Sequence, residues 1–342
     1  MKVGVIGGGG WGTALAIVLE SRGHAIRLWV YEEDLAEHMR RSRVNERFLP
    51  EVRVPDPIAI TSSLREATEG CETLLFVTPS HALRATAERI QKESPQAFQG
   101  MDWVTVATKG LEGKTLLRMS EVLAQTLPPP LADSIVVLAG PSHAEEVARR
   151  VPTLVVAASK NGERAVLAQE SYATEWLRIY TNDDVIGVEV GVSLKNVIAI
   201  AAGIADGLGF GDSTKAALLT RGLVEMARLG ECLGARAETL SGLAGMGDLI
   251  ATATSRHSRN RRLGEAIGRG ATLEEALASS PMVVEGVATA EVAVALARRH
   301  GIEVPIMEQV YAILYEGKSA KTALRELLTR DLKPEARTLS RR

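Results

Sequence analysis

The stretch VGVIGGGGWGTALA, residues 3–16, determines the fold of the amino-terminal part of the chain. An apolar, β-branched run comes first, and Gly7, Gly9 and Gly12 follow in a GxGxxG pattern at the start of a helix-favouring segment. Here the first glycine permits a tight turn, the second lets the backbone approach a pyrophosphate, and the third allows close contact between helix and strand. The beginning of the helix supplies unpaired N–H groups and positive potential. The segment therefore predicts a dinucleotide-binding turn, with a glycine-rich turn that holds no ligand as the alternative.

The residues after the second apolar run bear on which dinucleotide binds. An acid about twenty residues beyond the glycines commonly bonds the adenosine ribose hydroxyls of NAD. Here the run ends in WVYEE, residues 29–33, so the acid comes one residue late and could instead cap the next helix. Arg22 and Arg27 could meet the 2′-phosphate of NADP. The choice between NAD and NADP therefore stays open.

Apolar, β-rich runs alternate with stretches at helical spacing through the first half of the chain. This alternation is typical of an α/β fold with a doubly wound parallel sheet, and we expect it to form one domain over residues 1–184. The expected strands are Val3–Ile6, Ile26–Val30, Leu74–Val77, Trp103–Ala107, Ile135–Leu138, Thr153–Ala158 and Leu177–Thr181, and the expected helices are Thr13–Ser21, His81–Gln91, Leu116–Leu127 and Glu163–Glu170.

The pattern changes beyond about Asp184, where Ala, Leu, Arg and Glu dominate at i, i+3 and i+4 spacing. This predicts an all-helical second domain over residues 185–342. Breaks that contain glycine are expected at 207–211, 242–247 and Gly270. The expected helices are Val188–Ala205, Ser213–Leu233, Arg259–Arg269, Leu273–Ala278, Glu285–His300 and Ile306–Tyr315.

Composition excludes several classes of partner. The 342 residues include 40 Lys and Arg against 42 Asp and Glu, so the net charge of -2 provides no excess positive field for a nucleic acid. Cys71 and Cys232 cannot build a disulfide framework, and their spacing does not suggest a metal site, which favours a reducing cytoplasm. The uncharged run 3–19 is interrupted by glycines, so neither a membrane span nor a signal peptide is expected there.

Lys195 lies within an unusually apolar stretch, GVSLKNVIAIAAGIADGLG, residues 191–209. A nicotinamide enzyme that reduces a ketone needs a proton donor near the carbonyl, and desolvation lowers the pKa of a lysine toward the working pH. Asp248, in the run SGLAGMGDL, could orient the ammonium group. The alternatives are a lysine that snorkels off its helix and an acid that stabilises a helix start.

Three further segments predict ligand contacts. Residues 258–262, SRNRR, combine a serine N-cap with donor-rich side chains at the positive end of a helix, which indicates a phosphate site; a solvated basic face is the alternative. The loops around Lys109 and over 140–144 follow expected strands, where open α/β sheets bind ligands. Helix capping explains Ser142 and Glu145 equally well.

Eight segments taken together closely resemble bacterial NAD(P)-dependent sn-glycerol-3-phosphate dehydrogenases over nearly the whole chain. The resemblance implies an amino-terminal Rossmann domain and a helical carboxyl-terminal domain similar to that of 6-phosphogluconate dehydrogenase. It also implies the reduction of dihydroxyacetone phosphate to sn-glycerol 3-phosphate for phospholipid synthesis, a cytoplasmic location and a homodimer. The segments are GGGGWGTALA, VTPSHALR, ATKGLE, LAGPSHAEE, VGVSLKNVIAIAAGIADGLGFG, LAGMGDL, SRNRRLG and VVEGV.

The resemblance also implies roles for individual residues. Lys195 would donate the proton to the substrate oxygen and accept it in the reverse direction, and Lys109 and Arg259 would contact both substrate and cofactor. Gly10, Ser142 and Tyr31 depart from or vary within the family pattern, which puts only the cofactor preference in doubt. The other implied substrate contacts are Gly140, Ser142, Asp248, Ser258 and Asn260, and the other implied cofactor contacts are Gly10, Trp11, Tyr31, Ala144, Val283 and Glu285, beside the glycines of the turn.

Two other functions compete with this one. A β-hydroxyacid dehydrogenase or ketopantoate-type reductase would share both domains and a catalytic lysine, but would not require the SRN phosphate segment at 258–260. A non-catalytic dinucleotide sensor would keep the glycines but would not need Lys195, Asp248 and that segment together.

Overall fold

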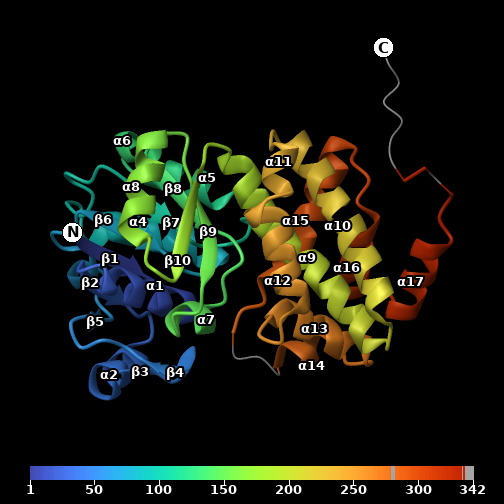
Figure 1. Cartoon of the computed structure of the whole chain (residues 1–342), viewed down its shortest axis with the longest axis horizontal. Helices are drawn as coiled ribbons and strands as arrows, with labels where there is room; N and C mark the ends of the chain where they lie inside the picture. Colours follow the sequence, from blue (N-terminus) through green and yellow to red (C-terminus); the bar gives the residue numbers. More distant parts are fainter. Residues whose placement is uncertain (279–281, 333, 336–342) are drawn as a thin grey trace, which may run out of the picture.

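The structure is a computed structural model that describes residues 1–278, 282–332 and 334–335. A half that contains the main sheet and an all-helical half lie side by side along the longest axis of the molecule (Figure 1). The last strand of the sheet ends at Asn182, and the long helix α9 begins at Val185. The change from strands to helices therefore falls where the change of sequence pattern predicts it.

Among the described residues, the main sheet has eight strands in the order β10-β9-β8-β7-β6-β1-β2-β5. The predicted doubly wound sheet is confirmed, with one correction: β9 runs antiparallel to β8, so β9 and β10 point opposite to the other strands. An apolar run looks the same in either direction, so the sequence does not reveal this reversal. The strands are β1 Lys2–Ile6, β2 Ala25–Trp29, β5 Ala59–Thr61, β6 Thr73–Phe76, β7 Val104–Val106, β8 Ile135–Ala139, β9 Thr153–Ala158 and β10 Leu177–Asn182.

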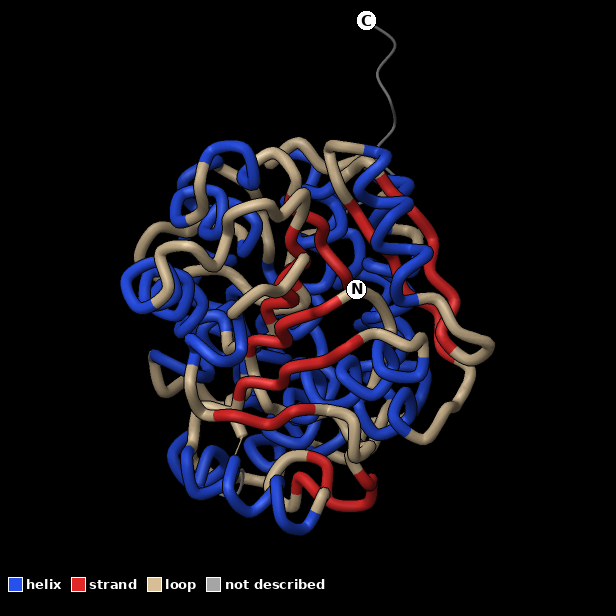
Figure 2. The backbone as a smooth tube through the Cα atoms, turned by 90° about the vertical axis from the view of Figure 1, so that its left-hand side faces the viewer, coloured by secondary structure: helices blue, strands red, loops and turns tan. Residues whose placement is uncertain are grey.

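Helices cover both faces of this sheet, as Figure 2 shows. Successive side chains of a strand point to opposite faces, so a strand covered on both sides is expected to be apolar at nearly every position. In β6, Leu75 packs into one core and Leu74 and Phe76 pack into the other, and all three are fully buried. The helices of this half are α1 Gly10–Ser21, α2 Glu33–Ser42, α3 Leu64–Thr68, α4 Leu83–Glu93, α5 Met119–Thr126, α6 Pro129–Ala132, α7 Ala144–Ala148 and α8 Gly162–Tyr172, with a 3-10 turn at Ser80–Ala82.

A small hairpin that the sequence pattern does not predict consists of β3 Val44–Asn45 and β4 Leu49–Arg53. Its strands are short, exposed at several positions and interrupted by proline, so they lack the apolar pattern of the main sheet. The buried amide of Asn45 donates 2.8 Å hydrogen bonds to the carbonyl of Gly8 and to the hydroxyl of Thr13. The hairpin is thereby fixed against the glycine-rich turn.

Helix α9, Val185–Gly207, forms the centre of the helical half and contacts α10, α12, α13, α15 and α16. It is long and apolar enough to span a membrane, but 94% of its most apolar window is buried inside the protein, as in a helix at the core of a globular domain. The helices around and beyond it are α10 Asp212–Cys232, α11 Ala237–Leu240, α12 Asp248–Thr254, α13 Arg259–Gly268, α14 Leu273–Ala278, α15 Glu285–His300, α16 Pro305–Tyr315 and α17 Ala320–Leu328.

Glycines allow α9 and α13 to pack with their backbones in contact. A Cβ at Gly203 would overlap the carbonyl of Arg261, and one at Gly264 would overlap the carbonyl of Ile200. Small residues at a crossing let two helices approach more closely than side chains normally permit. The first turn of α13 is therefore held close to the middle of α9.

A buried ion pair joins the two halves. Glu189 of α9 receives a 2.6 Å hydrogen bond from Arg118 and further hydrogen bonds from the N–H and the hydroxyl of Ser120 at the start of α5. The side chains of Arg118 and Glu189 are 13% and 5% exposed. This carboxylate therefore both pairs a buried guanidinium and caps a helix in the opposite half.

Glu189→Ala is expected to lower the free energy of unfolding by about 3–5 kcal/mol, because it removes the buried partner of Arg118 and the acceptor of the N–H and hydroxyl of Ser120. The measurement is urea denaturation of both proteins. Glu121→Ala is the matched control, since Glu121 pairs with the same arginine but is 41% exposed, and it should cost about 1 kcal/mol or less. Equal losses in the two variants would contradict a special role for the buried pair.

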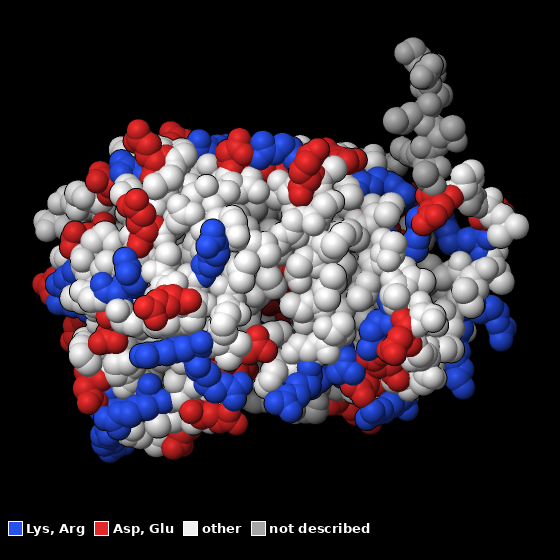
Figure 3. All heavy atoms as spheres, in the orientation of Figure 1, with Lys and Arg blue, Asp and Glu red and all other residues white. Residues whose placement is uncertain are grey.

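Charges of both signs are mixed over the face drawn in Figure 3, and the middle of this face is largely uncharged. This distribution agrees with the net charge of -2. On this face, the described residues form no extended patch of one sign that would suit a polyanion.

Candidate active site

Lys195 lies in the middle of α9, with its side chain only 6% exposed. Its Nζ donates hydrogen bonds to Oδ1 of Asp248 at 2.8 Å and to Oγ1 of Thr252 at 2.5 Å. A lysine that is buried and paired in this way does not snorkel to solvent, so that alternative is wrong. Thr252 is a partner that the sequence analysis did not identify.

Asp248 is the first residue of α12, and a π-helical turn, Leu243–Gly247, runs directly into this helix. The glycine break expected at 242–247 is therefore a helical turn rather than a loop. A Cβ at Gly191 would lie 2.6 Å from the carbonyl of Ala244, so this glycine allows the turn to pack on α9. Gly191 and Lys195 are four residues apart and share one face of the helix. The same contact thus brings Asp248 to Lys195.

Lys109 reaches the same carboxylate from the sheet-containing half. It follows β7, and its Nζ donates 3.0 Å hydrogen bonds to Oδ2 of Asp248 and to the carbonyl of Gly140, which follows β8. The carboxyl ends of neighbouring parallel strands meet at the edge where open α/β sheets bind ligands. Asp248 therefore bridges two ammonium groups, one from each half of the molecule.

Burial lowers the pKa of Lys195 to about 8, although the carboxylate of Asp248 opposes this shift. The charges of Lys109 and Arg259 act in the same direction as burial. For Asp248, burial favours the neutral acid, but the two ammonium groups outweigh it and hold its pKa below the ordinary value. At neutral pH the site thus contains a carboxylate and a lysine that can hold or release a proton.

Hydrogen bonds between amide groups connect the first turn of α13 to the part of α9 that carries Lys195. Nδ2 of Asn260 donates a 2.9 Å hydrogen bond to Oδ1 of Asn196, the residue next to Lys195. Oδ1 of Asn260 accepts a 3.0 Å hydrogen bond from the N–H of Gly286. The hydroxyl of Ser258 caps α13, as its sequence position predicts.

The arginines of this turn point in different directions. Nη1 of Arg259 donates a 2.8 Å hydrogen bond to the carbonyl of Val283, and burial lowers the pKa of Arg259. Nε of Arg261 instead donates to Asp206 at 2.7 Å. Of these two arginines, only Arg259 therefore contacts another predicted ligand residue.

The glycine-rich turn has the shape that a pyrophosphate requires. Gly7 has a φ of +131°, and a Cβ at Gly12 would overlap the carbonyl of Gly7. No described heavy atom lies within 4 Å of the position that a Cβ at Gly9 would occupy. The first turn of α1 contains no acidic residue, and the indole N–H of Trp11 is buried with no partner among the described residues. The residues present thus fit a dinucleotide.

Gly10 is enclosed by two other elements. A Cβ there would lie 2.7 Å from the carbonyl of Phe48 and 3.6 Å from the Cβ of Ala144. The hairpin therefore gives a local reason for glycine at this position. It also places Ala144 beside the glycine-rich turn.

The end of β2 bears on the choice between NAD and NADP. Tyr31 is 69% exposed. Glu32 precedes α2, but its side chain makes no capping hydrogen bond; its Oε1 lies 3.5 Å from Nη1 of Arg47. Arg22 donates to the carbonyl of Glu170, and Arg27 donates to carbonyls of α3 and its end. Both arginines considered for a 2′-phosphate therefore bind backbone carbonyls and do not pair with groups at the end of β2.

Two other predicted residues have partners within the protein. Glu285, at the start of α15, accepts hydrogen bonds from the N–H and hydroxyl of Ser80 at 3.1 and 2.5 Å, which is a further contact between the halves. The hydroxyl of Ser142 donates to the carbonyl of Gly140 at 3.3 Å. Ser80 and Asn45 were missed because each acts on a residue distant in the sequence.

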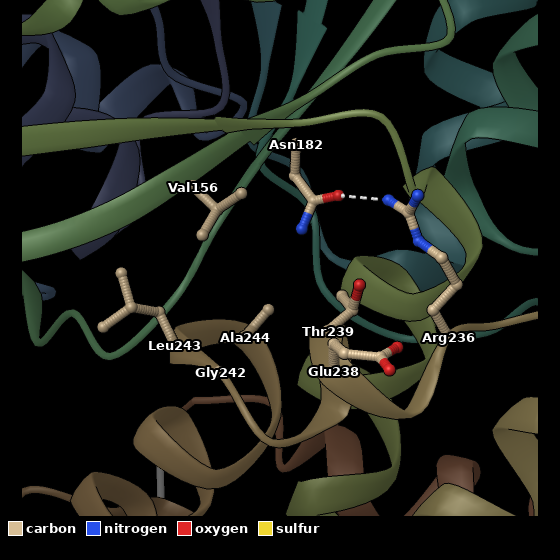
Figure 4. Close-up of a pocket in the computed structure, with 8 residues that line it drawn as sticks. All are labelled: Val156, Asn182, Arg236, Glu238, Thr239, Gly242, Leu243 and Ala244. Carbon is tan, nitrogen blue, oxygen red and sulfur yellow. Dashed lines mark hydrogen bonds between the residues drawn. The ribbon is translucent and has the colours of Figure 1, made fainter.

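A cavity of about 420 Å³ has a lining of its own (Figure 4). Its wall includes the guanidinium of Arg236, which is bound to Asn182 and Asp183. None of the predicted site residues lines this cavity. Its described lining consists of Val156, Asn182, Arg236, Glu238, Thr239, Gly242, Leu243 and Ala244.

Comparison with known proteins identifies the family. Residues 2–165 match the family model described as the N-terminus of NAD-dependent glycerol-3-phosphate dehydrogenase, and residues 184–325 match the model of its C-terminus. Glycerol-3-phosphate dehydrogenases [NAD(P)+] of Geobacter sulfurreducens and Chlorobium limicola are 49% and 48% identical to this chain; each alignment covers 98% of this chain and 98% or 99% of the relative.

A solved structure gives the same result. The crystal structure of glycerol-3-phosphate dehydrogenase from Coxiella burnetii superposes with a TM-score of 0.90 at 40% identity, covering 96% of this chain and 99% of that one. The match extends over both halves of this chain. The chain therefore belongs to the NAD-dependent glycerol-3-phosphate dehydrogenase family.

Proposed function

We propose that this protein reduces dihydroxyacetone phosphate reversibly to sn-glycerol 3-phosphate with NADH or NADPH, and so supplies glycerol 3-phosphate for phospholipid synthesis. The observation that carries the proposal is the carboxylate of Asp248 between the ammonium groups of Lys195 and Lys109. This cluster lies between the ligand-binding edge of the sheet and the first turn of α13.

The glycine-rich turn, with Trp11 and Ala144 beside it, would hold the cofactor. When bound, the reduced nicotinamide supplies the hydride that the ketone carbon accepts. Charge then develops on the substrate oxygen, and Lys195 delivers a proton to it. In the reverse direction neutral Lys195 removes the proton from the hydroxyl. Asp248 keeps the amine in position through its 2.8 Å hydrogen bond.

The phosphate of the substrate would bind at the first turn of α13. Ser258, Arg259 and Asn260 surround the positive end of this helix, where backbone N–H groups and a guanidinium favour an anion. Lys109 would contact both substrate and cofactor from the end of β7. Gly140, Ser142, Val283, Glu285 and Tyr31 complete the proposed contacts.

Arg259→Ala is expected to raise the KM for dihydroxyacetone phosphate by roughly 10- to 100-fold, because a hydrogen bond to a charged group contributes about 1.5–3 kcal/mol. Initial rates over a range of substrate concentrations measure it. Arg261→Ala is the control, since Arg261 pairs with Asp206 instead. An unchanged KM in the Arg259 variant would place the phosphate elsewhere.

We also propose the division into domains at residues 1–184 and 185–342, which is supported by the end of β10 at Asn182 and the start of α9 at Val185. Closure of these domains on the ligands would exclude water and strengthen the charge contacts of the site. The cytoplasmic location and the homodimer stay predictions from the sequence.

The test is the oxidation of NADH and of NADPH, followed at 340 nm with dihydroxyacetone phosphate, dihydroxyacetone, ketopantoate and 3-oxo acids. We expect rapid turnover only with dihydroxyacetone phosphate. Turnover of ketopantoate or a 3-oxo acid instead would support the related reductases. Cofactor binding without turnover of any substrate would support a dinucleotide sensor.

A further inference from the structure

The carboxyl end of β2 brings one acidic and one basic side chain together. Glu32 follows the strand directly, and Arg47 comes from the tip of the β3–β4 hairpin. Their Oε1 and Nη1 atoms are 3.5 Å apart, and the side chains are 32% and 49% exposed. Both groups are therefore accessible to a ligand at this end of the sheet.

The hairpin is held in a defined place beside the cofactor turn. Arg47 lies between Asn45, which donates to the carbonyl of Gly8, and Phe48, whose carbonyl lies against Gly10. The N–H of Phe48 also donates to the side chain of Asn45 at 3.2 Å. Arg47 is consequently anchored on both sides to the turn expected to hold the pyrophosphate.

An exposed ion pair of this kind contributes little to stability, a factor of about five or less in an equilibrium. Arg47 can therefore exchange the carboxylate of Glu32 for another acceptor at small cost. A carboxylate at the end of the second strand can accept hydrogen bonds from ribose hydroxyls, whereas a 2′-phosphate repels it and suits an arginine.

The other basic side chains nearby have different partners. Arg27 binds carbonyls of Glu66 and Glu69, and Arg22 binds that of Glu170. Arg43 donates to the carbonyls of Val54 and Ile58, and Arg53 pairs with Asp56. Arg40 and Arg41 lie in the last turn of α2, at the end away from β2.

We propose that Glu32 and Arg47 together let this chain accept both cofactors. Glu32 accepts hydrogen bonds from the adenosine ribose of NADH, and Arg47 turns from Glu32 to bind the 2′-phosphate of NADPH. This inference rests on the proposed function only in requiring a dinucleotide at the glycine-rich turn.

The experiment is fluorescence titration of the purified full chain with NADH and with NADPH, without substrate. Arg47→Ala should raise the Kd for NADPH at least about tenfold and leave that for NADH within about threefold, because only NADPH carries the 2′-phosphate. Glu32→Gln should raise the Kd for NADH and leave NADPH binding equal or tighter. Calorimetry with 2′,5′-ADP and 5′-AMP should show the same selectivity without the nicotinamide.

Arg53→Ala removes an exposed arginine from the same hairpin and is the matched control; both Kd values should stay within about threefold. Equal weakening of both cofactors by Arg47→Ala would mean that the residue acts only on hairpin structure, and no change would place the 2′-phosphate elsewhere. Either result overturns the proposal. Because no substrate is present, these outcomes are separate from a failure to turn over dihydroxyacetone phosphate.

Discussion

Replacing Lys195 with alanine is expected to lower kcat for the reduction of dihydroxyacetone phosphate by at least about a hundredfold, the low end for a positioned general acid. The side chain is buried, and its pKa of about 8 suits proton transfer near neutral pH. In the variant, water would have to donate the proton instead of the lysine, in a site where charge is poorly screened. The measurement is steady-state kcat, together with the Kd for the cofactor, which should change little.

Lys215→Ala provides a matched control for this prediction. Lys215 is also an ion-paired lysine of the helical half, but its partner is Asp206, which keeps a second partner in Arg261. We expect this variant to retain most of kcat. An active Lys195→Ala enzyme would contradict the assignment of the proton donor.

Asp248→Asn is expected to move the alkaline limit of kcat for reduction down by at least about one pH unit, because an adjacent opposite charge typically shifts a pKa by 1–3 units. Loss of the carboxylate removes the main contribution that raises the pKa of Lys195, so more of the lysine is neutral at pH 8. The rate of reduction at that pH should then fall about fivefold or more. The pH dependence of kcat measures both effects.

Thr252→Val is the control that separates the effect of the lost charge from the effect of altered packing around Lys195. It removes the other hydrogen-bond partner of Lys195 without changing the charge of the site. Its pH profile should therefore shift less than that of Asp248→Asn. If both variants shift equally, or if Asp248→Asn leaves the profile unchanged, the carboxylate does not control the proton affinity of Lys195. Circular dichroism would establish that each variant is folded.

The parts of the fold that could be predicted are those with a strong local pattern. Strands such as β1 and β8 are apolar runs buried along nearly their whole length, and helices such as α9 and α15 have apolar residues at helical spacing. The direction of β9 leaves no such trace. The β3–β4 hairpin was missed because its position depends on the buried hydrogen bonds of Asn45, which join residues distant in the sequence.

The sequence predicted which residues form the site, but it predicted fewer of the contacts between them. An isolated lysine in the apolar segment of α9 indicated Lys195, and the glycine pattern indicated the cofactor turn. The bridge from Asp248 to Lys109 depends on the contact between the two halves. A helix predicted from Asp248 would have placed Thr252 on the same face, since the two are four residues apart. The glycines of 242–247 concealed that helix because they also suit a loop.

The pH dependence of kcat in both directions, with saturating substrate and cofactor, tests the central claim most directly. Reduction needs protonated Lys195, so its rate should fall as the pH rises through about 8. Oxidation of sn-glycerol 3-phosphate needs the neutral amine, so its rate should rise through the same range. We predict that the two rates change in opposite directions over this pH range, and that both changes are absent in Lys195→Ala. Rates that do not depend on pH between 6 and 10, or that change in the same direction, would contradict Lys195 as the group that gives and takes the proton.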